Sequence, residues 1–399
     1  MEIRRTPDTA VLSRSPEIQV PIQYTSDFAR EARYAQKRVW VQCMDFEMGH
    51  ASGIIQNAMR QAAVRGVDTR LTIDGFAVAM VNDKMGIIPK HGEDKAFQQV
   101  TQKADRDMFE GTDDDRSMFY KLGLKNAGVD VVVTNPKIAK IIPVQLFPFI
   151  GRNHMKITIV DDIAWFGGVN IASDHFEKAD FMVKITDPEI VHALAEIFPQ
   201  VNQKKPEKDF KKEINGNYSV LVDRGDRGKS IILDEALEMI KGASETIQFI
   251  SQLPPSGKVL DALLEQARQG VDVDVITQAE SNLNSNSIPF GLLMKRSYQG
   301  FLARTRDFPG IRLHHFRDHH GKVHAKMVIV DEKLALWGSH NLDESGVKVG
   351  TQEVSMRTTD PRLVPKLVAV FDQIKNGTYD LGFQEGRFNP QGFTGEELA

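Results

Sequence analysis

The sequence predicts an α/β fold made of two repeated halves. The stretch HMKITIVDD at residues 154–162 returns in nearly the same form as HAKMVIVDE at residues 324–332. The segments before and after each copy also recur in the same order, and a repeat on this scale decides the architecture of a chain. A length of 399 residues leaves room for two domains, each with its own core.

Each half begins with the same alternation of helices and strands. In the first half we expect a helix, a strand, a second helix and a second strand, at 26–37, 38–45, 53–66 and 67–74. The corresponding segments of the second half lie at 229–243, 245–251, 257–270 and 271–277. Ser26 is the expected N-cap of the first helix. Gly66 and Gly270 each end a helix, because glycine accepts the left-handed conformation found there.

Two apolar strands joined by a tight turn follow in each half. The strand that carries the repeated motif turns through Asp161-Asp162 in the first half and through 331–333 in the second. The returning strand ends in GGVN at 167–170 or in GSHN at 338–341. The first turn is one residue shorter, and we interpret this as a change of turn that preserves the strand register.

The pattern divides the chain into five parts. We predict an N-terminal extension, a first repeat, a linker, a second repeat and a C-terminal tail, at 1–24, 25–201, 202–217, 218–378 and 379–399. A polar insertion at about 80–115 is either a solvated decoration or a lid over a site. Each repeat closes with a helix capped by Asp187 or Asp360, with proline next in its first turn.

The composition is that of a soluble globular protein. Charged residues make up 26% of the chain and the formal net charge is −4, so no bulk affinity for nucleic acid is indicated. The single cysteine, Cys43, cannot form a disulfide within the chain. We find no secretory signal and no membrane-spanning segment, and expect a cytoplasmic protein that lies peripherally on the inner membrane face. The apolar stretch at 141–151 is either core or, as we favour, a loop that contacts acyl chains.

The repeated motif carries side chains that suit a phosphate group. Side chains alternate along a strand, so His154 and Lys156 share one face, as do His324 and Lys326. A neutral imidazole can attack phosphorus or transfer a proton, and an ammonium group can hold phosphate oxygens. In-line displacement at a phosphodiester needs one histidine on each side of the phosphate. The two motifs supply that pair.

Amide and hydroxyl groups complete the predicted phosphate-binding set. Asn170 and Asn341 follow the returning strands, and Ser339 is included with them. A lone histidine or lysine on a strand is commonly structural, but two copies at equivalent repeat positions favour a functional site.

Carboxylates form the last predicted group. An attacking histidine needs its other ring nitrogen held, and Asp180 and Glu353 occupy matching positions for that role. Asp161 and Asp331 belong to the repeated motif and are counted with the catalytic residues, although we expect them to brace the hairpin turn or a lysine.

The two HxKxxxxD motifs, each followed by Gly-x-x-Asn, resemble the phospholipase D superfamily. The stretch at 296–316 and the motif VHAKMVIVD at 323–331 are similar to bacterial cardiolipin synthases and related phosphatidyltransferases, and the likeness covers residues 25–378. The resemblance implies two α/β/α sandwiches related by a pseudo-two-fold axis, no metal or other cofactor, and a ping-pong reaction through a phosphohistidine. It assigns the nucleophile to His154 and the general acid to His324.

Two departures from the family pattern leave the substrate and the acceptor open. The residues at 344–346, ESG, replace the Arg-Ser pair that follows the second motif in the family. The N-terminal membrane helices of many cardiolipin synthases have no counterpart in this sequence.

The function expected is phosphodiester transfer or hydrolysis on glycerophospholipids, with a phospholipid substrate, an alcohol or water acceptor, and a membrane surface as partner. The alternative is a metal-independent nuclease, which the net charge of −4 and the lack of a basic-aromatic stripe disfavour. A non-catalytic scaffold is disfavoured by the two intact motifs. The histidine-rich run at 314–324 lacks the spacing of a structural zinc site, so we expect no metal there.

Overall fold

The structure is a computed structural model in which two similar repeats pack side by side. It describes residues 15–46, 50–74, 119–134, 151–171, 175–176, 178–201, 208–278, 288–306, 308–316 and 322–381. The expected insertion at about 80–115 lies outside these described residues, as does the apolar stretch at 141–151 apart from Gly151.

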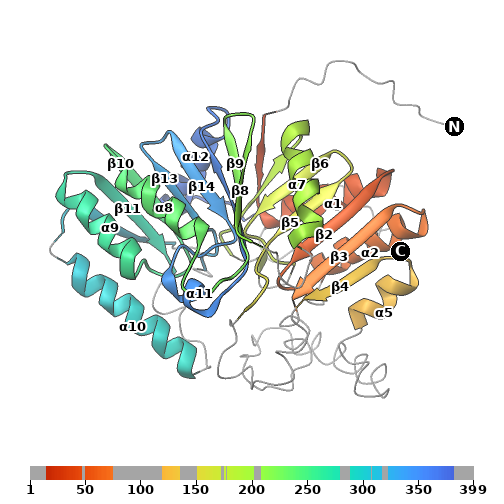
Figure 1. Cartoon of the computed structure of the whole chain (residues 1–399), viewed down its shortest axis with the longest axis horizontal. Helices are drawn as coiled ribbons and strands as arrows, with labels where there is room; N and C mark the ends of the chain where they lie inside the picture. The colour runs from red at the N-terminus through yellow and green to blue at the C-terminus, as the bar shows by residue number, and fades with distance from the viewer. Residues whose placement is uncertain are drawn as a thin grey trace.

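Each repeat contains one mixed β-sheet, and the two sheets share a strand order (Figure 1). The first runs β4-β3-β2-β5-β6-β7-β1 and the second β12-β11-β10-β13-β14-β15-β9-β8. The first sheet consists of β1 Glu17–Gln19, β2 Arg38–Cys43, β3 Asp68–Asp74, β4 Asp130–Thr134, β5 Ile157–Val160, β6 Ile163–Gly167 and β7 Met182–Ile185. The second consists of β8 Phe210–Ile214, β9 Tyr218–Asp223, β10 Thr246–Ile250, β11 Asp272–Thr277, β12 Ile311–His315, β13 Met327–Val330, β14 Leu334–Gly338 and β15 Glu353–Thr358. Matching strands occupy matching places, which confirms two repeats related by a pseudo-two-fold axis.

Helices cover both faces of each sheet. They are α1 Pro21–Tyr34, α2 His50–Val64, α5 Phe119–Asn126, α7 Pro188–Val201, α8 Ile231–Lys241, α9 Gly257–Arg268, α10 Ile288–Thr305, α11 Glu344–Val349 and α12 Val364–Asn376. The pairs α1/α2 and α8/α9 pack on the outer faces, whereas α7 and α12 contribute to the core between the sheets. Of the described helices, none combines the length and apolar composition that crossing a bilayer requires. Each repeat is an α/β/α sandwich, as the resemblance implied.

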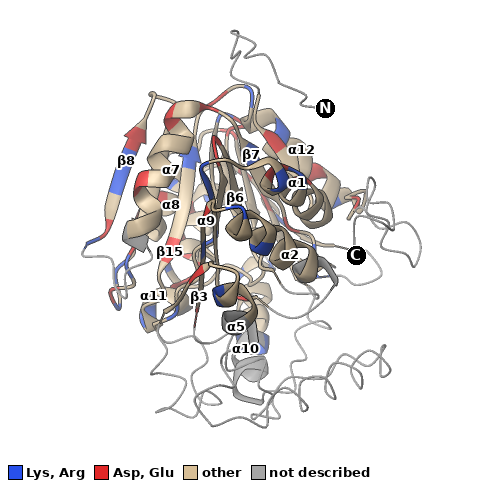
Figure 2. Cartoon of the chain, turned by 90° about the vertical axis from the view of Figure 1, so that its right-hand side faces the viewer, with Lys and Arg blue, Asp and Glu red and all other residues tan. Residues whose placement is uncertain are grey.

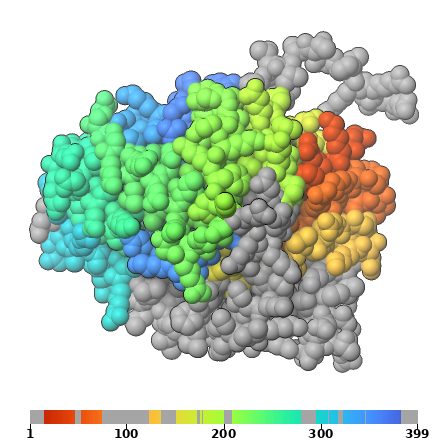
Figure 3. Space-filling model, in the orientation of Figure 1, coloured from red at the N-terminus to blue at the C-terminus, as the bar shows by residue number. Residues whose placement is uncertain are grey.

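The apolar core between the repeats fixes their relative position. It takes side chains from α7 and α12 and from the central strands of both sheets. Phe166 of β6 meets Trp337 of β14 edge-on, with ring centroids 6.2 Å apart, and both side chains are buried. On the face drawn in Figure 3, residues of α7 and β8 adjoin. Close packing of this kind tolerates little displacement, so apolar contacts set how the two motifs face each other.

The two hairpins keep the same register despite their unequal turns. Ile157 pairs with Phe166 in the first hairpin, and Met327 pairs with Trp337 in the second. The extra residue of the second turn is absorbed by Glu332, which has a left-handed φ of 53°. The interpretation of the shorter turn as a local change is therefore confirmed.

Helix ends agree with the sequence at three positions. Gly66 and Gly270 follow α2 and α9 with φ angles of 86° and 91°, the left-handed region that glycine allows. Asp187 caps α7, because its Oδ1 accepts from the backbone N–H of Glu189 at 3.0 Å. These three predictions are confirmed.

Helix starts differ from the sequence at two positions. The helix expected to start after Ser26 begins at Pro21, since proline already has the φ of a first helical residue and Gln23 Oε1 accepts from the N–H of Val20. The helix expected directly after Asp360 begins at Val364, because Asp360 first caps a turn by accepting from the N–H of Arg362 at 2.8 Å.

Three of the expected part boundaries also need correction. The N-terminal extension contributes β1, which pairs with β7, and the C-terminal tail begins with the buried side chains of Tyr379 and Leu381. Residues 210–214 of the expected linker form β8, which pairs with β9 at the edge of the second sheet. The consecutive charged residues Lys211, Lys212 and Glu213 of β8, coloured along the strand in Figure 2, gave this segment the composition of a solvated linker. Charged side chains of this kind are typical of an exposed edge strand.

The two motif aspartates lie at the far ends of their strands, roughly 20 Å of extended chain away from the motif histidines. Asp161 accepts from three consecutive backbone N–H groups, those of Gln36, Lys37 and Arg38. Asp331 accepts in the same way from the N–H groups of Ser244, Glu245 and Thr246. Counting Asp161 and Asp331 as catalytic was wrong, because each anchors the loop that enters the neighbouring strand, which pairs antiparallel with the motif strand.

Removing this anchor should weaken folding. Asp331→Asn is expected to lower the free energy of unfolding by about 1–2 kcal/mol at pH 7, measured by urea denaturation. Burial works to raise the pKa of Asp331, but hydrogen bonds from Thr246 and Glu245 outweigh it and lower the pKa. The stabilisation is therefore fully present above the ordinary aspartate pKa and is lost as the pH falls through the lowered value. The difference in the free energy of unfolding between Asp331→Asn and the parent should therefore become smaller in acid.

The matched control is Glu332→Gln, at the exposed next position of the same turn. Equal destabilisation by the two substitutions at pH 7 would contradict the anchoring role.

Candidate active site

The two motif segments meet at the interface between the repeats. The backbone N–H of His154 donates to the carbonyl of Gln352 at 2.9 Å, and that of His324 donates to the carbonyl of Ala179 at 3.0 Å. Each motif therefore forms a short bridge with the segment just before the last strand of the other repeat. Backbone pairing brings both histidines to the pseudo-two-fold axis.

Each motif histidine is held by a carboxylate from the other repeat. His154 Nδ1 lies 3.0 Å from both carboxylate oxygens of Glu353, the first residue of β15. His324 Nδ1 lies 2.6 Å from Asp180 Oδ2, just before β7. The sequence placed these two carboxylates at matching positions but did not indicate that the pairs cross between repeats.

The two pairs differ in what supports the carboxylate. The Ser339 hydroxyl donates to Glu353 Oε2 and accepts from the N–H of Val354 at 3.0 Å. The matching residue of the first repeat is Gly168, where a Cβ would come 2.5 Å from Asp180 Oδ1. The hydroxyl of Ser339 is engaged with a carboxylate, so its assignment to the phosphate-binding set is corrected to a positioning role.

The two motif lysines are buried, and each bonds to the backbone of the histidine two residues before it. Lys156 Nζ donates to the carbonyl of His154 at 2.6 Å, and Lys326 Nζ donates to the carbonyl of His324. An ammonium group has three donors, so each lysine keeps donors for a ligand after this bond.

Burial lowers the pKa of both lysines. It brings the pKa of Lys156 to about 8, and Glu353 is the largest opposing influence. It brings the pKa of Lys326 to about 7, and Asp180 is the largest opposing influence. The positive charge of each lysine is therefore supported by the carboxylate that also holds a histidine.

The two histidines are neutral at physiological pH. Burial lowers the pKa of His154 to about 4, even though Glu353 works to raise it. Burial also lowers the pKa of His324 well below its ordinary value, and the charge of Lys326 adds to the effect. A neutral imidazole retains the lone pair that a nucleophile or a base needs.

The two carboxylates respond differently to burial. Burial works to raise the pKa of Glu353, but its contact with His154 outweighs this and the pKa falls to about 2. Burial raises the pKa of Asp180, with the charge of Lys326 opposing. Glu353 therefore holds its negative charge down to a lower pH than Asp180 does.

The two asparagines follow the returning strands, and the structure shows a histidine contact for one of them, Asn170 with His175. Asn170 is buried; its Oδ1 is 3.4 Å from the backbone nitrogen of Asp45, and its Nδ2 is 3.4 Å from His175 Nε2. Asn341 accepts at its backbone carbonyl from Ser251 at 2.6 Å. Within the described part of the chain, the buried Oδ1 of Asn341 has no hydrogen-bond partner.

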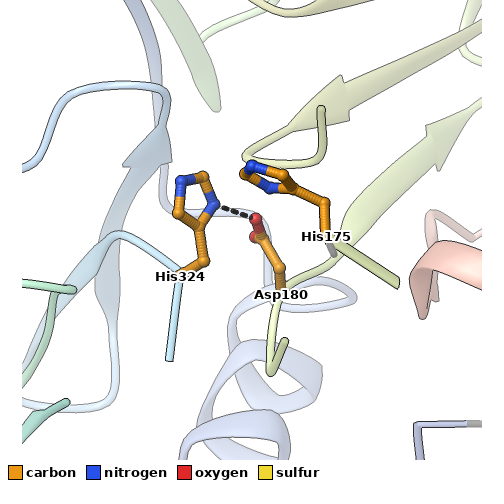
Figure 4. A group of neighbouring side chains, drawn as sticks. All are labelled: His175, Asp180 and His324. Carbon is orange, nitrogen blue, oxygen red and sulfur yellow. Dashed lines mark hydrogen bonds and ion pairs between the residues drawn. The ribbon is translucent and has the colours of Figure 1, made fainter. Parts of the chain in front are cut away.

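Two residues near His324 were missed by sequence reasoning. His175 packs edge-on against the ring of His324, with centroids 4.5 Å apart, and both lie beside Asp180 (Figure 4). Tyr379 donates its hydroxyl proton to the backbone carbonyl of Asp180 at 2.7 Å. Neither belongs to the repeated pattern, so no periodic signal could have identified them.

A buried ion pair holds the residues just before the first motif. Sequence reasoning did not identify this pair either. Arg152 Nη1 donates to Asp74 Oδ1 at 3.1 Å, and both side chains are fully buried. The same carboxylate accepts from the N–H of Asn153 at 2.8 Å. The pair thus ties the residues before His154 to the end of β3.

Members of the histidine-rich run at 314–324 separate in the structure. His314 contacts Asp274 at 2.7 Å and His315 contacts the Tyr298 hydroxyl at 2.8 Å, both on β12. Only His324, of the described histidines in this run, reaches the candidate active site.

Comparisons with known proteins agree with this geometry. The chain is 27% identical over 252 residues to cardiolipin synthase A of Buchnera aphidicola subsp. Schizaphis graminum, covering 57% of this chain and 48% of that protein. It is 30% identical over 217 residues to cardiolipin synthase A of Buchnera aphidicola subsp. Acyrthosiphon pisum, covering 48% of this chain and 42% of that protein. The chain therefore spans about half the length of the curated relatives it matches.

A solved structure shares the fold of most of the chain. The phosphatidylserine synthase of Haemophilus influenzae superposes with a TM-score of 0.63 and 13% identity, covering 92% of this chain and 88% of that one. The family described as "Cardiolipin synthase, PLD-like domain" matches residues 29–202 and 236–375, which contain both HxKxxxxD motifs and both carboxylates. The chain belongs to this phospholipase D-like family.

Proposed function

We propose that the protein transfers or hydrolyses the phosphodiester of a glycerophospholipid through a phosphohistidine intermediate. The observation that carries the proposal is the crossed pair of buried histidines, each held at Nδ1 by a carboxylate of the other repeat. An ionised carboxylate only accepts hydrogen bonds, so Nδ1 carries the proton and the lone pair of the neutral ring is at Nε2. A histidine in this tautomer is ready to attack phosphorus.

The surroundings of the two rings support His154 as the nucleophile. Its ring gains positive charge as Nε2 bonds to phosphorus, and the neighbouring Glu353 stays ionised because its pKa is about 2. Asp180 has a raised pKa and supports such a charge less strongly. We therefore assign His324 as the general acid.

In the first step, the bond between His154 Nε2 and phosphorus forms while the bond from phosphorus to the leaving alkoxide breaks. His324, protonated at Nε2, gives that proton to the alkoxide and becomes neutral. Burial disfavours the protonated form of His324, but the negative charge of a bound phosphodiester favours it. The acid form is therefore populated when substrate occupies the site.

In the second step, an alcohol or water attacks phosphorus and gives its proton to Nε2 of His324. The bond between phosphorus and His154 Nε2 breaks, and both histidines return to their starting protonation states. An alcohol acceptor gives a new phosphodiester, and water gives a phosphomonoester. The choice of acceptor therefore decides between transfer and hydrolysis.

Charge stabilisation comes from side chains of both repeats. The ammonium groups of Lys156 and Lys326 and the amides of Asn170 and Asn341 are assigned to the non-bridging oxygens of the phosphate. Buried donors interact more strongly with developing charge than the same groups in water. The proposed chemistry therefore needs no metal ion.

The names of the related proteins and the net charge of this chain both support a glycerophospholipid as the substrate. The family and the relatives above carry the names cardiolipin synthase and phosphatidylserine synthase, both of which describe phosphatidyl transfer. The net charge of −4 disfavours polyanionic nucleic acid as the substrate. We propose phosphatidylglycerol-type lipids at a membrane surface as the first substrates to test.

Purified protein should turn over phosphatidylglycerol vesicles, and activity should survive excess EDTA because the buried lysines and amides supply the charge stabilisation. The assay follows release of glycerol and formation of new phospholipid by mass spectrometry. Single- and double-stranded DNA, tested in the same buffer, serve as the competing substrates. Cleavage of DNA without lipid turnover, or lipid activity lost in EDTA and restored by Mg²⁺, would contradict the proposal.

The two histidine variants should respond differently to the leaving group. His154→Ala should abolish turnover and the covalent intermediate. His324→Ala removes the general acid, which typically costs ~10²–10⁴-fold, and a nitrophenyl phosphodiester should partly restore its rate because that leaving group needs little protonation. Rapid quench followed by peptide mapping locates the phosphate. Phosphate on His324, or parental turnover of unactivated lipid by either variant, would refute the assignment.

The rate should also fall in acid. Protonation of His154 removes the attacking lone pair, so kcat/KM should decrease as the pH falls through about 4. Glu353 works to raise the pKa of His154, so Glu353→Gln should shift this limb to lower pH as well as lowering the rate. Ser339→Ala, which keeps the carboxylate charge, is the matched control. An equal shift in both variants would argue against the Glu353 charge as the cause.

A further inference from the structure

His324 lies in a cluster with Asp180 and His175, and the proposed reaction gives His175 no role. One ring nitrogen of His175, one of His324 and one carboxylate oxygen of Asp180 all lie within 4.8 Å of one another, and all three side chains are buried. Figure 4 shows both imidazole rings gathered around the Asp180 carboxylate. Among the described residues, this is the one group of three potential metal ligands, so His154 has no equivalent.

The ligand set suits zinc or a similar divalent transition metal. Two imidazoles and one carboxylate are a common three-ligand set for Zn²⁺, with bonds of ~2.0–2.2 Å and a fourth position left for water. Tetrahedral bonds of that length place ligand atoms about 3.3 Å apart, so His324 Nδ1 and Asp180 Oδ2, now at 2.6 Å, would separate slightly.

Neighbouring groups already orient two of the three ligands. The backbone N–H of Phe181 donates to Asp180 Oδ1 at 2.9 Å, and Asn170 Nδ2 lies 3.4 Å from His175 Nε2. Outer contacts of this kind fix the direction of metal ligands and add to affinity. The cluster is thus oriented by the fold, not assembled from mobile surface side chains.

Nearby positive charges limit the affinity of this cluster. The charges of Lys326, Lys156 and Lys178 all act on Asp180, which is the single carboxylate of the group. These ammonium groups repel a divalent cation, so binding should be weak and reversible. A resident metal cofactor is therefore not the expected role.

We propose that His175, Asp180 and His324 form an inhibitory binding site for zinc or another divalent transition metal. The metal binds the lone pair of His324 Nδ1, and the single ring proton that Asp180 had accepted moves from Nδ1 to Nε2. A metal-bound neutral ring with its proton at Nε2 has no lone pair left to accept a second proton, and it would have to become an imidazolate to give its proton away. His324 can therefore act neither as the acid nor as the base while the metal is bound. The binding part of the proposal stands on the cluster alone, and the inhibitory part rests on the proposed role of His324.

Metal binding is measured first and without lipid. Co²⁺ alone is titrated into the EDTA-treated, dialysed full chain, and the visible absorption of tetrahedral Co²⁺ reports the site. We expect one Co²⁺ per chain, displaced by Zn²⁺. His175→Gln should weaken binding at least ~10-fold, whereas His175→Cys, which supplies a thiolate ligand, should retain it. The control is His192→Gln, because His192 is an exposed residue of α7.

Zinc inhibition is measured second, with each variant compared to its own metal-free rate on phosphatidylglycerol vesicles. Zn²⁺ should inhibit the parent and the His192→Gln variant reversibly, and the midpoint should rise at least ~10-fold in His175→Gln. Circular dichroism identifies a variant that fails to fold, in which case the His175→Cys data decide. Absence of Co²⁺ binding by the parent, or equal binding by parent and folded His175→Gln, would overturn the site. Binding without lipid turnover would uphold the site and reject the proposed function instead.

Discussion

The crossed contacts between His154 and Glu353 and between His324 and Asp180 are the constraint on which the site depends. Neither repeat can complete either pair alone, because each histidine and its carboxylate come from different repeats. The backbone bridges at Gln352 and Ala179 and the apolar core around Phe166 and Trp337 hold the repeats in the one arrangement that satisfies both pairs. The two repeats therefore form one shared site to which both must contribute, not two independent sites.

Burial sets the protonation of the ionisable groups in this site except Glu353, where the contact with His154 outweighs it. It lowers the pKa of both histidines and both lysines, and it raises that of Asp180. Removing charges from water is costly, so each buried ammonium is accompanied by a carboxylate and each carboxylate by hydrogen-bond donors. The same low-polarity surroundings that create this cost strengthen interactions with a phosphate charge.

The pseudo-symmetry of the fold does not make the two half-sites chemically equal. Glu353 is longer than Asp180 by one methylene. The hydroxyl of Ser339 contacts the Glu353 carboxylate, whereas the matching residue beside Asp180 is Gly168, which has no side chain. On the other side, His175 packs against His324. Two nearly identical motifs thus acquire different electrostatic surroundings, which gives the fold a way to separate a nucleophile from an acid without changing either histidine.

The sequence by itself determined the repeat, the α/β class, most strands, and which histidines, lysines and carboxylates the fold brings together. It could do so because periodicity, glycine positions and spacing are local, and a repeat displays each of them twice. It misassigned Asp161, Asp331 and Ser339, since their hydrogen-bond partners lie on other elements. Only the tertiary structure decided that the carboxylates cross between repeats and that His175 joins one pair. These contacts join residues such as His154 and Glu353 that lie far apart in the chain, and pairing across that distance depends on packing, which no local pattern encodes.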